Sequence, residues 1–139
     1  MISLPGMVQA ADPRTVDYRV RAALEFMEAH LAEPLTVTEI ARHVGVSADY
    51  LESLFHRDTG EAPMHTLRVM RLREAERLLS ASQLSQTEVA AQVGFTGLDI
   101  SHFRRDFRAF SGVTPRRYRE ASRLEKAGEG APLGTTQGP

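Results

Sequence analysis

Apolar residues recur along this chain at spacings of three and four, the spacing that places side chains on one face of an α-helix. Val20, Leu24, Met27 and Leu31 form the first such stripe. No stretch alternates between apolar and polar residues in the way that predicts a half-buried strand. The pattern therefore indicates an all-α fold with about seven helices, arranged as two helix-turn-helix subdomains joined by a long linker helix.

Capping residues and glycines indicate where these helices begin and end. Thr36 and Ser85 are each followed three residues later by a glutamate, the capping-box pattern of a helix N-terminus. Gly45 suits the left-handed backbone that ends many helices, and Pro63 suits the first helical position. The expected helices run from about Asp17 to Ala32, from Thr36 to Gly45, over 48–59, from Pro63 to about Ser80, from Ser85 to Gly94 and over 99–111, and a final basic helix begins at Thr114-Pro115.

The strongest feature of the sequence is an internal repeat. The segment 36–47, TVTEIARHVGVS, is similar to the segment 85–96, SQTEVAAQVGFT. An alanine recurs (Ala41, Ala90) where two steeply crossing helices need a small side chain, and a glycine recurs where the turn between them needs a positive φ. The repeat predicts two copies of a helix-turn-helix whose second helix is free to enter a DNA major groove. The alternative is an all-helical repeat with no role in DNA binding.

Two stretches carry a specific family pattern. They are 40–60, IARHVGVSADYLESLFHRDTG, and 88–119, which contains GF, SHF, an Arg and Phe pair, and GVTP with a following Tyr. Through them the chain, from about Val16 to Glu120, resembles the DNA-binding domain of the AraC/XylS family of bacterial transcription regulators. The resemblance implies a bi-lobed domain whose two recognition helices, here 48–59 and 99–111, enter adjacent major-groove segments of double-stranded DNA.

The resemblance also implies partners and a division of the chain. Related proteins regulate transcription by contacting RNA polymerase from their DNA site, so double-stranded DNA and RNA polymerase are the expected partners. An effector-binding or dimerisation domain is not expected within these 139 residues, so the chain is either a free-standing short member or the C-terminal part of a larger regulator. The expected division is a flexible N-terminal tail at 1–15, a first subdomain at 16–62, a linker helix at 63–80, a second subdomain at 81–121 and a flexible C-terminal tail at 122–139.

Composition argues against several other classes of function. The chain has no cysteine, which excludes a disulfide framework, a thiolate zinc site and a cysteine nucleophile, and agrees with a reducing cytoplasm. No apolar run approaches the roughly 20 residues of a membrane span. The histidines lack the H-x-x-x-H spacing of a metal site, and there is no glycine-rich phosphate loop or nucleophile elbow. We therefore expect a cytoplasmic protein that does not bind a membrane, is not an enzyme, and needs no metal or cofactor.

Charge is distributed unevenly along the chain. The formal net charge at pH 7 is −1, which argues against indiscriminate binding to nucleic acid. Residues 1–60 hold more acidic than basic side chains, whereas residues 102–126 are rich in arginine. The second subdomain and the helix after it should therefore supply most of the affinity for DNA. The DNA-binding residues expected there are Thr96, Gly97, Asp99, Ser101, His102, Arg104, Arg105, Arg108, Arg116 and Arg117.

The first recognition helix is acidic where it should contact DNA. Asp49 and Glu52 would repel phosphates, although a carboxylate can accept a hydrogen bond from cytosine, and Ser53 stands where related domains often have arginine. This helix either makes weak or purely base-specific contacts or binds another protein. The same acidity motivates a rival interpretation, a protein-interaction module of helix-turn-helix fold with weak DNA affinity. The residues expected to read DNA here are Ser47, Ala48, Asp49, Tyr50, Glu52 and Ser53.

Several residues have two interpretations. The segment that leads into the second recognition helix is longer than the family's usual spacing, so either Asp99 or Ser101 is the expected N-cap of that helix. His102 either contacts DNA or has a capping or packing role, and Arg105 either contacts DNA or makes an internal ion pair. At least one of Arg116, Arg117 and Arg119 is expected to contact phosphate. The linker-helix residues Arg68, Arg71, Arg73 and Arg77 are mostly expected to pair with Glu74 and Glu76.

Overall fold

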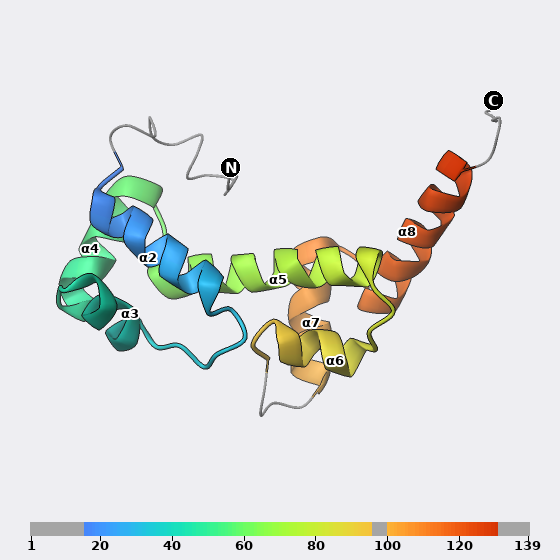
Figure 1. Ribbon diagram of the computed structural model, residues 1–139, viewed down its shortest axis with the longest axis horizontal. Coiled ribbons are helices and arrows are strands. Elements are labelled where there is room, and N and C mark those ends of the chain that lie inside the picture. Colours follow the sequence, from blue (N-terminus) through green and yellow to red (C-terminus); the bar gives the residue numbers. More distant parts are fainter. Residues whose placement is uncertain (1–15, 96–99, 131–139) are drawn as a thin grey trace. The chain divides into compact units, whose positions relative to one another are not determined.

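The computed structural model describes residues 16–95 and 100–130, and these ranges contain helices and connecting segments but no strand (Figure 1). The all-α prediction is therefore confirmed for the described part of the chain. The helices are, in order, α2 (Tyr18–Ala29), α3 (Val37–Val44), α4 (Ala48–Thr59), α5 (Pro63–Ala81), α6 (Gln86–Gln92), α7 (Ile100–Ser111) and α8 (Pro115–Gly130).

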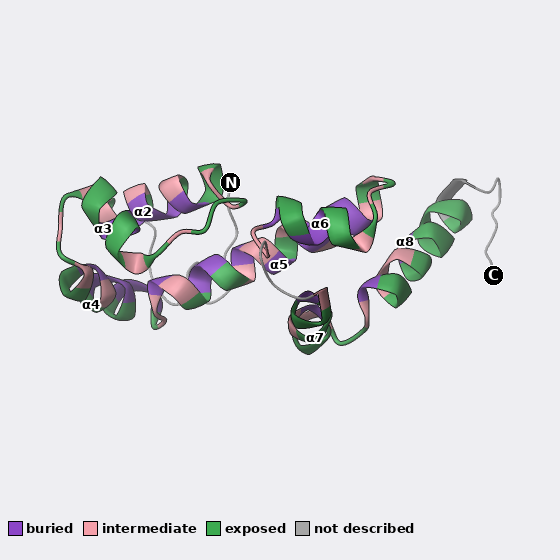
Figure 2. Cartoon of the chain, turned by 90° about the horizontal axis from the view of Figure 1, so that it is seen from below, coloured by how far each residue is buried: buried purple, intermediate pink, exposed green. Residues whose placement is uncertain are grey.

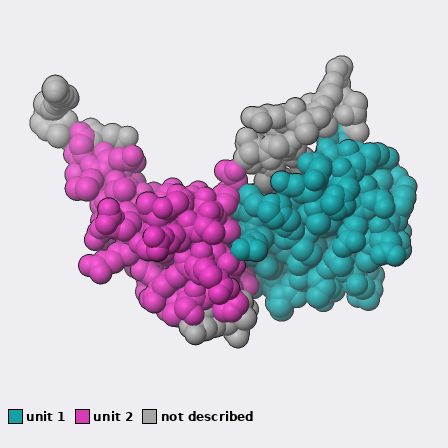
Figure 3. Space-filling model, turned by 180° about the vertical axis from the view of Figure 1, so that it is seen from behind, with its two compact units in different colours: residues 1–71 teal, residues 72–139 magenta. Residues whose placement is uncertain are grey.

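The chain divides into two compact units, residues 1–71 (unit 1) and residues 72–139 (unit 2), which Figure 3 colours separately. The boundary between them lies inside α5. The helix expected at 63–80 is thus one continuous helix, but its two halves belong to two different units. It joins the two units, as predicted, and each half contributes buried side chains to the core of its own unit.

Unit 1 consists of α2, α3, α4 and the first half of α5. Thr36 and Glu39 make both hydrogen bonds of the capping box that begins α3, and Gly45, at φ 90°, ends that helix. The Ser47 hydroxyl oxygen accepts a hydrogen bond of 3.1 Å from the Tyr50 amide and so caps α4. The turn between α3 and α4 therefore has the geometry that the capping residues predict. The fully buried side chains of this unit include Val20, Met27, Ile40, Leu51, Phe55 and Leu67, and buried positions are purple in Figure 2.

Unit 2 repeats this plan with the second half of α5, α6, α7 and α8. Ser85 and Glu88 form the second capping box, and Gly94 has a φ of 93°. Aromatic rings fill the core, where the Phe107 ring centroid lies 5.8 Å from that of Phe103 and 5.6 Å from that of Tyr118. The sequence repeat thus corresponds to two cores of the same design.

The last helix is longer than expected. We predicted a flexible tail at 122–139, but α8 continues to Gly130, so the prediction is wrong for residues 122–130. Ser122 is buried and its hydroxyl lies 2.7 Å from the Ser80 hydroxyl, and the Lys126 ammonium donates to the Ser80 carbonyl oxygen. These contacts are polar and link distant parts of the chain, so apolar periodicity gives no sign of them.

Other differences at the ends of elements are small. The first helix, expected at 17–32, ends at Ala29. The tail expected at 1–15 and the remainder of the C-terminal tail lie outside the described residues. Of the helices that the structure describes, none has the length and apolar content needed to cross a membrane.

Candidate nucleic-acid interface

Helix α4 presents the predicted DNA-reading residues on the outer surface of unit 1. Asp49, Tyr50 and Ser53 are exposed, whereas Leu51 and Phe55 on the opposite side of the helix are fully buried. The core residues therefore hold α4 by one side and leave the other side open to a partner. The remaining predicted readers are the exposed N-cap Ser47 and the partly exposed Ala48 and Glu52.

A network of charged side chains connects the start of α2 to α4. The Asp17 carboxylate accepts two hydrogen bonds of 2.9 Å from the Arg19 guanidinium, and the Asp17 amide donates to the Asp58 carboxylate at 2.8 Å. The hydrogen bonds from Arg19 hold the pKa of Asp17 well below its ordinary range. The Arg19 guanidinium also lies over the Tyr50 ring, 5.0 Å from its centroid. Arg19 is not among the expected DNA-reading residues, because its contact with Tyr50 joins two helices that are distant in sequence.

Helix α7 presents a basic outer surface in unit 2. Arg104, Arg105 and Arg108 are exposed, whereas Phe103 and Phe107 are fully buried. The aromatic side chains hold this helix against its core as the leucine and phenylalanine side chains hold α4. The two second helices therefore have the same architecture and opposite charge on their exposed sides.

The start of α7 is only partly described. Thr96, Gly97 and Asp99, which we expected to contact DNA, lie outside the described residues. Ser101 lies within α7, which begins at Ile100, so of the two alternative N-caps, Asp99 and Ser101, Ser101 is excluded and Asp99 lies outside the described residues. The Ser101 side chain is exposed on the surface of the helix.

Two of the three α7 arginines already contact other side chains. The Arg104 Nε donates to the Gln86 Oε1 at 3.0 Å. Arg105 donates to the His102 Nδ1 at 3.1 Å, and its Nε lies 3.8 Å from the Asp106 carboxylate. Arg105 and His102 thus have the internal contacts that were one of their two interpretations, although both remain exposed. The Arg108 guanidinium has no hydrogen bond or ion pair with any residue that the structure describes.

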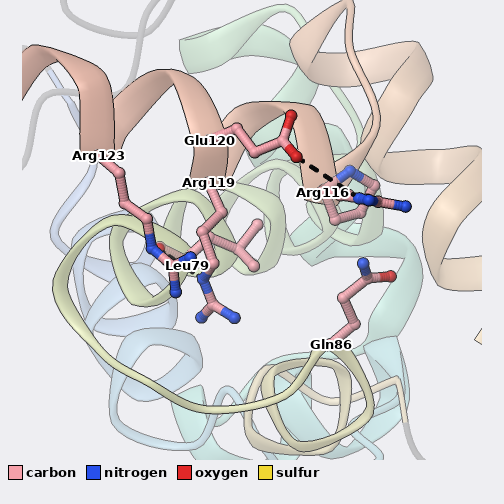
Figure 4. A pocket seen from close by; sticks show the side chains of 7 residues that line it. Leu79, Gln86, Arg116, Arg119, Glu120 and Arg123 are labelled. Atoms are coloured by element: carbon pink, nitrogen blue, oxygen red, sulfur yellow. Dashed lines mark hydrogen bonds and ion pairs between the residues drawn. The ribbon is translucent and has the colours of Figure 1, made fainter.

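The start of α8 and the start of α6 together line an open groove of about 350 Å³ (Figure 4). We call it the α6–α8 groove. Arg116, Arg119 and Arg123 lie at spacings of three and four and therefore share one side of α8. The Arg116 Nε lies 3.5 Å from the Glu120 carboxylate. The residues that line the groove are Leu79, Gln86, Pro115, Arg116, Arg119, Glu120 and Arg123.

The arginines at the start of α8 differ in whether their guanidinium groups already have hydrogen-bond partners. Arg119 donates to the carbonyl oxygens of Leu79 at 3.0 Å and Ser82 at 3.2 Å, so it stabilises the end of α5. Arg117 is exposed, its amide donates to the Thr114 hydroxyl oxygen at 3.2 Å, and its guanidinium has no partner among the described residues. Arg117 can therefore reach an external anion more freely than Arg119.

The arginines of α5 follow the expected pairing only in part. Arg77 pairs with Glu74 at 2.6 Å, as predicted. Arg71 instead donates to the carbonyl oxygens of Leu31 at 3.0 Å and Glu33 at 2.6 Å, and burial lowers its pKa. The i,i+3 rule considers only neighbours on one helix, and here the backbone after α2 is a better acceptor.

Within the ranges that the structure describes, no three His, Asp or Glu side chains are grouped closely enough to hold a metal ion. The described surface of unit 2 carries exposed arginines on α7 and α8. Cationic side chains of this kind bind phosphates and the acceptor edges of guanine.

Each unit joins a short helix through a glycine turn to a second helix with an exposed outer side, α3 to α4 and α6 to α7. This geometry defines a tandem helix-turn-helix protein. Residues 40–121 match a family model described as a helix-turn-helix domain. The chain belongs to this family, in its AraC/XylS class of transcription regulators.

Relatives of known structure agree with this assignment. A transcriptional regulator from Chromobacterium violaceum, described as an AraC-type DNA-binding domain-containing protein, is 32% identical with a TM-score of 0.71, and the match covers 76% of this chain and 92% of that one. The DNA-binding domain of AdpA, a global transcriptional factor solved in complex with a target DNA, is 30% identical with a TM-score of 0.72. That match covers 78% of this chain and 96% of the AdpA chain.

A longer curated relative matches this chain over part of its length. The probable thc operon regulatory protein of Rhodococcus erythropolis is 38% identical over 99 residues, which are 69% of this chain and 29% of that protein. The match to this chain therefore covers less than a third of the length of that curated relative.

Proposed function

We propose that this chain binds double-stranded DNA in a sequence-specific manner and regulates transcription, with α4 and α7 as its two recognition helices. The observation that carries the proposal is that both helices are held by buried side chains on one side and present polar and charged side chains on the other. The similarity to the AdpA domain solved with a target DNA supports it.

The two helices have different tasks in this proposal. The α7 arginines contact phosphates or the acceptor edge of guanine, and Arg108, with no partner among the described residues, is the first candidate. Arg116 and Arg117 at the start of α8 contact phosphates. In α4, Asp49 and Glu52 oppose phosphate binding, so Tyr50, Ser53 and these carboxylates refine specificity and add little affinity.

Regulation follows from the bound position. A protein seated on a promoter in this way contacts RNA polymerase, which is the second partner that we propose. Binding to chromosomal DNA also requires the protein to share the cytoplasm with it.

The proposal is tested by selecting binding sites from random DNA with the purified protein and measuring affinity by fluorescence anisotropy. We expect the selected duplex to bind at least about 10³-fold more tightly than random duplex near physiological salt. Equal affinity for both sequences, or no binding at low salt, would contradict the proposal.

The acidic exposed side of α4 favours a second candidate function, a protein-interaction module with weak DNA affinity. Reversal of charge at Arg104 and Arg108 distinguishes the two. If the protein binds DNA through α7, Arg104→Glu with Arg108→Glu abolishes DNA binding. If it is a protein-interaction module, the same double variant still binds its protein partner, because the contact is made through α4.

A further inference from the structure

We propose that the α6–α8 groove binds one phosphate of the DNA backbone. We also propose that Gln86, which lines this phosphate site, positions Arg104 of α7. This inference rests on the proposed function and adds Gln86, Arg119 and Arg123 to the residues that serve it. Gln86 and Arg123 were not among the expected DNA-binding residues, and Arg119 was expected only as one of three arginines of which at least one contacts phosphate.

Gln86 replaces an apolar residue of the internal repeat. It occupies the position that Val37 has in the first copy, where the valine packs against the core of unit 1. Gln86 instead lines the groove and receives the hydrogen bond from Arg104. Because arginine can only donate, the glutamine must present its oxygen to Arg104, which leaves its amide nitrogen to donate to another group. Gln86 thus has a polar side chain, in a fixed orientation, where the first copy of the repeat has the apolar Val37. This difference indicates that the Gln86 side chain makes a polar contact that has no counterpart in unit 1.

The groove is positively charged. Three of its seven lining residues are arginines, against one carboxylate, Glu120, which pairs with Arg116. In Figure 4 the side chains of Arg119 and Arg123 extend from α8 toward the same side. Like charges four residues apart on a helix repel each other. An anion in the groove would relieve this repulsion, and Arg123 has no ion pair with any described residue to do so.

Part of the proposed phosphate site is held in place before any ligand binds. Hydrogen bonds to the Leu79 and Ser82 carbonyl oxygens fix the Arg119 guanidinium at the groove. A charge that is already held in place loses little conformational freedom on binding an anion. Arg116 and Arg123 are exposed and can close on the anion from either side of it.

The connection to α7 identifies the anion as a backbone phosphate. Arg104 lies on the exposed side of the second recognition helix and is joined to the groove by its hydrogen bond with Gln86. A phosphate contact beside a reading helix sets the register of that helix on the duplex. The groove is also open, so a phosphodiester can enter it while the strand continues on both sides.

The first test measures affinity for the selected duplex over a range of salt concentrations. Arg123→Gln should weaken binding about three- to tenfold and lower the slope of log K against log salt by about one, because one phosphate contact is lost. Arg77→Gln, the matched control, removes the same charge from a residue outside the groove and should leave the slope unchanged. An unchanged slope for Arg123→Gln overturns this inference while the proposed function stands. Failure of the wild-type chain to bind any duplex overturns both.

Two substitutions of Gln86 separate its two roles. Gln86→Val restores the residue type of the first repeat and removes both the phosphate donor and the partner of Arg104. It should weaken binding several-fold and reduce the discrimination against single-base changes. Gln86→Glu keeps an acceptor for Arg104 but repels phosphate, so it should weaken binding while discrimination is retained. Equal discrimination by the wild type and Gln86→Val, at equal melting temperatures, overturns the positioning role.

A third experiment distinguishes a backbone phosphate from a free one. A single methylphosphonate removes the charge of one phosphate and is moved along the duplex. At one position the methylphosphonate should weaken DNA binding by the wild type several-fold and leave DNA binding by Arg123→Gln unchanged. That position identifies the phosphate that the groove binds. If no position does so, and inorganic phosphate without DNA raises the melting temperature of the wild type but not of Arg123→Gln, the groove binds free phosphate and the inference is overturned.

Discussion

Backbone conformation at single residues sets the turns on which both units depend. Gly45 ends α3 with a φ of 90°, a conformation that side chains with a Cβ rarely adopt. Gly128, in α8, has a helical backbone. An added Cβ would meet no atom within 4 Å at either position. At neither glycine would a steric clash therefore oppose an added side chain, so the two positions test the effect of backbone conformation.

We expect Gly45→Ala to lower the free energy of unfolding by about 1 kcal/mol or more, because alanine is strained at positive φ. Gly128→Ala should raise it slightly, by up to about 1 kcal/mol, because alanine favours helix. Urea unfolding followed by circular dichroism measures both. Equal effects of the two substitutions would show that φ does not decide the outcome.

The Asp17 carboxylate gives a second prediction at this scale. Its pKa in the folded chain lies below its ordinary value, chiefly because of the hydrogen bonds from Arg19. A lowered pKa stabilises the fold at pH values above the ordinary aspartate pKa of about 3.9, and this contribution is lost as the pH falls toward the folded value. Wild-type stability should therefore decrease as pH falls below about 4, and less so in Asp17→Asn. Unfolding by urea between neutral pH and acid measures this, and identical pH profiles would refute it.

At the scale of whole elements, arginines from later helices hold the ends of earlier ones. Arg71 of α5 donates to the backbone after α2, and Arg119 of α8 donates to the backbone at the end of α5. The Leu79 carbonyl group lies in the last turn of α5, where carbonyl groups have no partner inside the helix and a cation also offsets their partial negative charge. Leu31 and Glu33 follow the end of α2, so there Arg71 satisfies the carbonyl groups of a connecting segment. These contacts connect each helix-turn-helix to the helices around it.

Arg71→Met keeps most of the apolar stem but leaves the carbonyl oxygens of Leu31 and Glu33 without their donor. We expect a loss of about 1–3 kcal/mol of stability and faster hydrogen exchange in the segment 30–36. Arg77→Met is the control on the same helix, since Arg77 pairs only at the surface with Glu74 and should lose less than about 1 kcal/mol. If the two variants lose equal stability, the carbonyl contacts do not stabilise this segment.

At the scale of the whole molecule, the two units differ more in the charge of their exposed helices than in their fold. Both have the same helix-turn-helix scaffold, with Asp49 and Glu52 on the outer side of α4 and Arg104, Arg105 and Arg108 on that of α7. The near-zero net charge of −1 conceals this asymmetry. We therefore expect substitutions in unit 1 to change mainly the specificity of DNA binding and substitutions in unit 2 to change mainly its affinity.

Asp49→Asn combined with Glu52→Gln removes the repulsion between α4 and phosphates. We expect affinity for random duplex to rise several-fold and the ratio of selected to random affinity to fall, since the added attraction carries no sequence information. Competition anisotropy with both duplexes measures the ratio. A fall in affinity for random duplex would mean that these carboxylates contribute to binding.

Local patterns predicted most of the fold. The capping boxes at Thr36 and Ser85 and the glycine at 45 appear where the sequence indicates them, because capping and turn geometry depend on a few neighbouring residues. The exposed sides of α4 and α7 follow from helical periodicity in the same way. The site residues at 96, 97 and 99 lie outside the described residues and stay predictions.

The sequence by itself thus determined an all-α chain with two copies of one helix-turn-helix, its family, and an acidic and a basic recognition helix. The tertiary structure alone decided which polar side chains meet: Arg19 with Tyr50, Arg71 with the backbone after α2, and Gln86 with Arg104. The physical reason is the separation along the chain of the residues that interact. Helix periodicity and caps arise within one or two turns, whereas these contacts join residues far apart in the chain and exist only once the cores have packed.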